Sequence, residues 1–110
     1  MAERSVAATV VTYDAMPWVE RCLESLEGTE TVVVDHGSTD GTLDLVRGRF
    51  PAVRLVEQEN RGLAAGWNRG LAETAAELVL VVNSDAWLVG DGLAELVRVA
   101  ERRPDAGLIG

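Results

Sequence analysis

Lysine is absent from this chain of 110 residues, so all ten basic residues are arginines. This absence excludes a phosphate-binding loop that ends in Gly-Lys, a Schiff-base lysine and a Ser-Lys catalytic pair. Eighteen acidic residues give a formal net charge of -8. Such an acidic chain is not expected to bind a nucleic-acid backbone, because many phosphates would have to be neutralised.

Cysteine and histidine occur once each, as Cys22 and His36. One cysteine cannot form an intrachain disulfide, and the two residues together cannot complete a structural zinc site. Apolar runs stay far below the roughly 20 residues that span a bilayer, and the N-terminus lacks a signal-peptide profile. We therefore expect a cytoplasmic protein without a membrane span.

What the chain does contain is an ordinary globular composition, with 47% hydrophobic and 25% charged residues. These values predict a single domain over residues 1–110 with a real core. Apolar, mostly β-branched segments alternate with amphipathic segments of about ten residues. We predict strands at 6–13, 31–34, 53–57 and 78–82, the third of them at a sheet edge, and the start of a fifth at 107–110.

The alternation of strands and helices predicts an α/β fold: a doubly wound, mostly parallel sheet with helices on both faces. In the helix after residue 60, Gly62, Gly66 and Gly70 are spaced by four and predict a face that approaches a neighbour closely. Cys22 falls on the apolar stripe of the first helix and is expected in the core.

Polar residues gather where the predicted strands end. They are Thr12 to Asp14, Asp35 to Ser38, Glu59 to Gly62, and Asn83 to Asp85. Ligands of doubly wound sheets bind at the carboxyl ends of the strands, so these segments are the candidate site. The alternative interpretation is that Asp35 and Asp85 only cap the helices that follow them.

In order and spacing, these motifs resemble the nucleotide-sugar-binding half of family 2 glycosyltransferases, in particular the rhamnosyltransferase-like group. They are ThrTyrAsp, ValValValAspHisGlySerThrAspGlyThr, AsnArgGlyLeuAlaAlaGlyTrpAsnArgGly and LeuValValAsnSerAspAlaTrp. The resemblance covers residue 6 to the C-terminus. It implies a GT-A fold, which is Rossmann-like, and a nucleoside diphosphate sugar, UDP- or dTDP-linked, lying across the strand ends.

The resemblance also implies roles for individual residues. Thr12 and Tyr13 would line the base pocket, and Asp35 would accept a hydrogen bond from the base. The segment from Asn83 through Ser84 to Asp85 stands where the family has its Asp-x-Asp metal motif. Asp85 and Asn83 would then hold Mg²⁺ or Mn²⁺, with Ser84 counted among the ligand-binding residues.

Two positions depart from the family pattern: His36 stands where Asn is common, and Asn83 replaces the first Asp of the metal motif. A lone loop histidine is more often a hydrogen-bonding spacer than a base, so no catalytic base is assigned. We expect Trp18, Trp67 and Trp87 to be packing residues, because each adjoins an apolar helix or strand face.

In the family, the acceptor site and the base lie beyond the part that resembles this chain. Three interpretations follow: the donor-binding part of a glycosyltransferase, inactive in transfer alone; a truncated protein that binds nucleotide without catalysis; or an unrelated α/β interaction domain. We favour the first. An apolar C-terminal segment and an unpaired sheet edge also predict a homodimer, through the C-terminus or residues 53–57.

Overall fold

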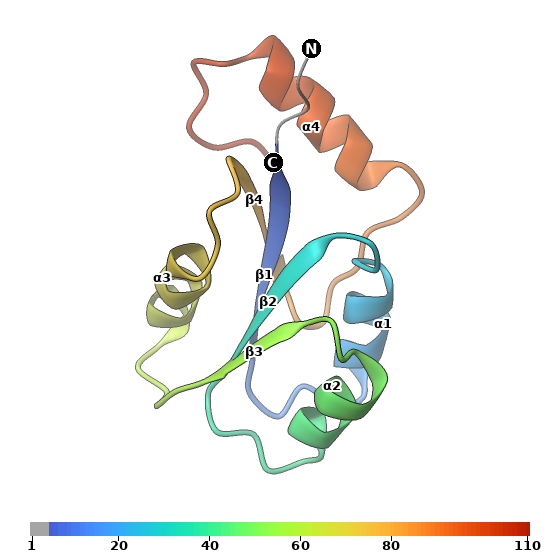
Figure 1. Cartoon of the computed structure of the whole chain (residues 1–110), viewed down its shortest axis with the longest axis vertical. Helices are drawn as coiled ribbons and strands as arrows, with labels where there is room; N and C mark the ends of the chain where they lie inside the picture. The colour runs from blue at the N-terminus through green and yellow to red at the C-terminus, as the bar shows by residue number, and fades with distance from the viewer. Residues whose placement is uncertain (1–4) are drawn as a thin grey trace.

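The computed structural model describes residues 5–110, in which strands and helices alternate along the chain (Figure 1). The strands are β1 (Val6–Thr12), β2 (Glu30–Asp35), β3 (Arg54–Glu57) and β4 (Leu78–Asn83). The helices are α1 (Trp18–Glu24), α2 (Thr42–Arg49), α3 (Leu63–Ala72) and α4 (Gly92–Arg102). The four strands predicted before residue 100 are thus confirmed, each within about two residues of its predicted bounds.

All four strands are parallel, and their order in the sheet is β3-β2-β1-β4. The chain first adds strands on one side of β1 and then crosses to the other side to form β4. The strand order therefore reverses between β1 and β4, as in a doubly wound sheet. The predicted fold class is confirmed.

One face of the sheet carries α1 and α2, and the opposite face carries α3 (Figure 1). The continuous apolar character of β1 and β2 follows from this arrangement, because both strands are covered on both faces. The buried core lies between the sheet and the first two helices. Its members include Ala8, Val10, Val19, Cys22, Leu23, Leu26, Val33, Val46, Phe50 and Val82.

Two glycines let α3 approach the sheet on its other face. A Cβ atom at Gly70 would lie 1.8 Å from Thr9 Oγ1 and 2.7 Å from Thr9 Cβ. At Gly66 it would lie 2.6 Å from a methyl group of Val11. Gly62 does not share this face as predicted, because it precedes the helix with φ of 97° and forms its N-terminal boundary.

The predicted fifth strand is wrong: residues 107–110 form no strand, and Leu108 is 94% exposed. The segment is apolar enough for a strand, but no described neighbour supplies the ladder hydrogen bonds that a strand requires. It lies beside α4 and β4, around an apolar cavity of about 280 Å³ near the amino ends of β1 and β4. Across residues 5–110, no helix combines the length and the apolar character needed to cross a membrane.

Candidate functional site

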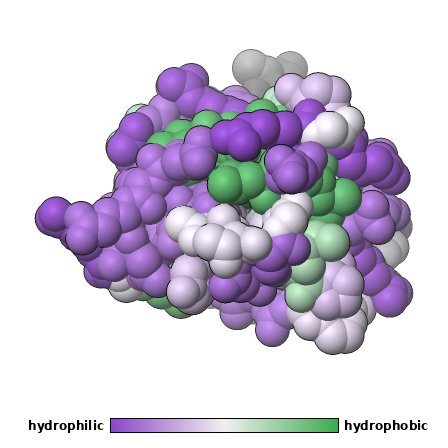
Figure 2. Space-filling view, turned by 90° about the horizontal axis from the view of Figure 1, so that it is seen from below, coloured by the Kyte–Doolittle hydropathy of each residue, from purple (hydrophilic) through white to green (hydrophobic). Residues whose placement is uncertain are grey.

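A second cavity, of about 380 Å³, opens at the carboxyl ends of β1 and β4, where the strand order reverses. Figure 2 views the molecule from this end and shows hydrophobic surface set among hydrophilic side chains. The cavity walls come from the end of β1 and its loop, the start of α1, one side of α3 and the loop after β4. Three separate segments of the chain, residues 11–18, 63–67 and 82–85, therefore meet there.

Four of the six predicted site residues line this cavity: Tyr13, Asn83, Ser84 and Asp85. Tyr13 is 59% exposed, and Asn83 and Asp85 are also exposed, so their polar groups are accessible to a ligand. The other two, Thr12 and Asp35, are wholly buried and do not line the cavity. Only the first group therefore lies at the surface of the cavity.

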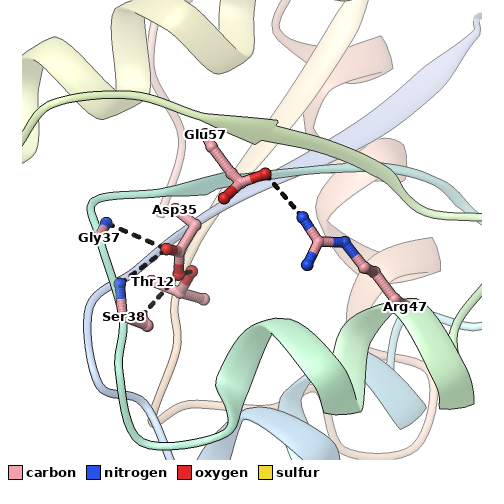
Figure 3. A network of polar contacts seen from close by, with 6 residues as sticks. All are labelled: Thr12, Asp35, Gly37, Ser38, Arg47 and Glu57. Carbon is pink, nitrogen blue, oxygen red and sulfur yellow. Dashed lines mark hydrogen bonds and ion pairs between the residues drawn. The ribbon is translucent and has the colours of Figure 1, made fainter.

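Asp35 is the centre of a hydrogen-bond network beneath the rim (Figure 3). One carboxylate oxygen accepts from Thr12 Oγ1 and from Ser38 Oγ, both at 2.6 Å. The other accepts from the backbone N–H groups of Gly37, at 3.0 Å, and Ser38, at 2.9 Å. Four donors satisfy the four lone-pair positions of a carboxylate. A direct hydrogen bond from a nucleobase to Asp35 would have to displace one of them.

The loop after β1 is fastened to the loop after β2. The Asp14 N–H donates to Ser38 Oγ at 2.8 Å, and the Thr39 N–H donates to an Asp14 carboxylate oxygen at 2.7 Å. Asp14 has φ of 46°, a left-handed conformation that Asp and Asn tolerate better than most residues. A second tie joins Met16 N–H to Asp40 at 3.0 Å. Together these bonds hold the rim in one conformation.

Local charge and hydrogen bonding shift two pKa values in this region. The Thr42 hydroxyl, and then the Met16 N–H, lower the pKa of Asp40, which stays ionised and anchors the start of α2. Burial, and secondarily the negative charge of Asp85, raises the pKa of Cys22 to about 11. Cys22 is thus an inert core thiol, as predicted from its place on the apolar stripe.

His36 lies away from the cavity, buried between β2 and α3. Its Nε2 atom is 3.1 Å from Gln58 Nε2, just after β3. The side chain joins the ends of two neighbouring strands, which agrees with its interpretation as a hydrogen-bonding spacer.

Two tryptophans that sequence analysis assigned to packing line the cavity. Trp18 begins α1 and is 54% exposed, and Trp67 projects from α3. Trp87 does pack as predicted, with the Arg21 guanidinium 4.1 Å from its ring centre. The position of Trp18 in the sequence could have indicated its place at the cavity, because a helix that follows a parallel strand begins at the edge of the sheet formed by the carboxyl ends of the strands.

The loop after β4 offers oxygen donors that suit Mg²⁺ or Mn²⁺, a carboxylate from Asp85 and an amide carbonyl from Asn83. Within residues 5–110, no three side chains of His, Cys, Asp or Glu gather as a metal-binding group. A divalent ion at this loop would therefore take most of its ligands from outside the protein.

Comparison with known proteins supplies the family. Residues 8–110 match the family described as Glycosyl transferase family 2. The sequence is 33% identical to an N-acetylglucosaminyl-diphospho-decaprenol L-rhamnosyltransferase of Mycobacterium tuberculosis (strain ATCC 25618 / H37Rv), covering 91% of this chain and 38% of the relative. It is 28% identical to EpsH of Bacillus subtilis (strain 168), covering 96% of this chain and 33% of EpsH. The chain thus spans about a third of the length of these relatives.

The fold agrees with that assignment. A crystal structure of S. aureus TarS 1-349 superposes with a TM-score of 0.79 at 25% identity, covering 91% of this chain and 33% of TarS 1-349. The crystal structure of TarS 1-349 in complex with UDP superposes with a TM-score of 0.71 at 23% identity, over the same shares of the two chains. The sheet, the helices on its two faces and the family match lead to one conclusion: this chain belongs to glycosyl transferase family 2 and has the Rossmann-like architecture of the GT-A fold.

Proposed function

We propose that this chain is the donor-binding part of a glycosyltransferase and binds a nucleoside diphosphate sugar, UDP- or dTDP-linked, together with Mg²⁺ or Mn²⁺. The observation that carries the proposal is the cavity at the strand-order reversal, lined by Tyr13, Asn83, Ser84 and Asp85. TarS 1-349, a protein of similar fold, has been crystallised in complex with UDP, which supports the proposal of a nucleotide ligand.

In this proposal Tyr13 contacts the base, while Asn83, Ser84 and Asp85 face the diphosphate. Asp85 and Asn83 would hold the metal through a carboxylate oxygen and an amide carbonyl oxygen. When bound, the metal supplies Lewis-acid stabilisation of the departing diphosphate. The reaction is an inverting transfer: an acceptor hydroxyl oxygen bonds to the anomeric carbon, the bond to the diphosphate breaks, and a base takes the hydroxyl proton.

Thr12 and Asp35 serve the same site from beneath. The Asp35 carboxylate holds the backbone N–H groups of Gly37 and Ser38, and Ser38 in turn holds the loop that carries Asp14. Their proposed role is to fix the rim against which the nucleotide binds, because preorganised loops lose less entropy on binding.

The experiment is titration calorimetry of the chain with UDP, dTDP, ADP and GDP, each in Mn²⁺ and in EDTA. We expect selective binding of a pyrimidine diphosphate, strengthened by Mn²⁺. Equal binding of all four nucleotides, or no binding at all, would remove the proposed site.

Variants separate the proposed roles. Asp85→Ala should abolish the strengthening by Mn²⁺, whereas Asp105→Ala, which removes the same charge from an exposed position outside the cavity, should retain it. Asp35→Asn should weaken binding with and without metal, since its NH2 group would replace the oxygen that accepts from the Thr12 and Ser38 hydroxyls. Asp44→Asn on the exposed side of α2 is its control. If Asp85→Ala and Asp35→Asn responded to Mn²⁺ identically, the assigned roles would be wrong.

A further inference from the structure

The cavity has an aromatic wall, of which the proposed roles use only Tyr13. Of the five aromatic residues in the chain, three line this cavity: Tyr13, Trp18 and Trp67. Trp18 leaves 54% of its surface exposed, although tryptophan is highly buried on average. A large apolar ring exposed inside a cavity that also holds polar groups is typical of a ligand contact.

The helix geometry places Trp18 on the β4 side of the cavity. Trp18 and Cys22 are four residues apart on α1 and share a face of the helix. Cys22 Sγ lies 3.6 Å from the backbone oxygen of Asn83, so this face of α1 lies against the loop after β4. Helical side chains lean toward the N-terminus, which brings Trp18 up to the rim beside that loop.

Tyr13 lies on the other side of the same cavity. It directly follows β1, and its neighbour Asp14 is tied through Ser38 and Thr39 to the loop after β2. The cavity therefore presents Tyr13 near β2, Asp85 on the loop after β4, and Trp18 beside that loop on α1.

We infer that Trp18 is the platform for the sugar ring of the donor. The inference rests on the proposed function, in which the base lies at Tyr13 and the diphosphate at Asp85. The sugar is attached to the phosphate farther from the nucleoside, so it lies beyond Asp85 as seen from Tyr13. A pyranose ring presents a face of C–H groups, and the exposed indole of Trp18 offers an apolar surface for it beside the end of β4.

The test compares a nucleotide sugar with its own nucleoside diphosphate in Mn²⁺. UDP-glucose, UDP-N-acetylglucosamine and dTDP-rhamnose are titrated first, and the probe that binds wild type most tightly is used. Trp18→Ala should weaken the binding of this probe about tenfold, the value expected for an aromatic contact of about 1.4 kcal/mol. The affinity for the diphosphate should stay within about twofold of the wild-type value. Trp18→Phe, which keeps a ring, should give an intermediate loss.

The control variant is Val89→Ala, an exposed apolar truncation outside both cavities, which should change neither affinity. Fluorescence gives a second measurement. The nucleotide sugar should quench tryptophan emission more than the diphosphate does, and Trp18→Phe should abolish this difference while Trp87→Phe retains it.

If Trp18→Ala lost the same affinity for the nucleotide sugar as for the diphosphate, Trp18 would contact the nucleotide and not the sugar. That result would overturn the inference. Unchanged affinities in that variant would overturn it as well, while leaving the proposed function intact. Failure of the proposed function has a separate signature, because wild type itself would then bind none of the diphosphates.

Discussion

The close approach of α3 to the sheet makes Gly70→Ala a sharp test of the packing. In an open helix this substitution stabilises by up to about 1 kcal/mol, because alanine restricts the unfolded backbone and favours the helix. Here the new methyl carbon would lie 1.8 Å from Thr9 Oγ1 and 2.7 Å from Thr9 Cβ. Rotating Thr9 about χ1 relieves only the first contact, so α3 must move away from β1.

Overpacking of this kind costs about 1 to 3 kcal/mol, and the displaced helix also loses contacts along β1 and β2. We therefore expect a net loss of about 1 to 2 kcal/mol in the free energy of unfolding, after the helix-propensity gain is subtracted. That loss is a substantial part of the roughly 5 to 15 kcal/mol typical of a domain.

The assay is urea unfolding followed by far-ultraviolet circular dichroism. Gly48→Ala is the matched control: Gly48 also lies inside a helix, α2, but a Cβ atom there would meet nothing within 4 Å. This control should be stabilised by about 0.5 to 1 kcal/mol. The same chemical change should thus have opposite signs at the two positions.

A Gly70→Ala protein as stable as Gly48→Ala would refute the packing described for α3. Thr9→Ala in the Gly70→Ala background should recover part of the loss, because it removes the oxygen nearest to the new methyl group. Since α3 also carries Trp67 at the cavity, Gly70→Ala should weaken nucleotide binding as well.

Two further predictions concern the core thiol and self-association. The raised pKa of Cys22, about 11, means that the unfolded thiol ionises first as pH rises. The free energy of unfolding should therefore fall as the pH rises from about 9 to about 11, and it should fall less steeply in Cys22→Ala. Urea unfolding at several pH values in this range measures both curves. Parallel curves for the two proteins would contradict the prediction. The predicted homodimer should form through the apolar β4 and C-terminal side, because β3 carries the ion pairs Arg47–Glu57 and Arg54–Glu73. Light scattering should show the dimer strengthening with salt, and a monomer at high concentration and high salt would disprove it.

Much of the fold could be predicted because the two central strands, β1 and β2, are short apolar runs covered on both faces. The β-branched segments at β1 and β2 leave few alternatives to a buried parallel sheet. The prediction was wrong at residues 107–110, where apolar composition alone was taken as evidence for a strand. Composition does not report whether a pairing partner is present, and strand formation depends on one.

Part of the cavity lining could be predicted, while the roles of these residues toward a ligand stay predictions. Tyr13, Asn83, Ser84 and Asp85 were identified because polar residues after parallel strands converge on one rim. Sequence reasoning could not tell that Asp35 points below the rim and Tyr13 into the cavity, since both simply follow or end a strand. It also took Trp18 for a packing residue, because an aromatic residue at a helix start has the same local pattern whether buried or exposed.

By itself, the sequence determined the secondary-structure order, the parallel sheet and the family, because these depend on local apolar patterning and on motif spacing. Tertiary structure alone decided which strand ends adjoin, since the order β3-β2-β1-β4 places Asn83 beside Val11 and not beside Asp35. It also decided which side chains line the cavity. Burial and hydrogen bonding depend in part on residues distant in the chain: one of the four donors to Asp35 comes from Thr12, 23 positions away, and Trp18 is exposed beside a segment more than 60 residues further on.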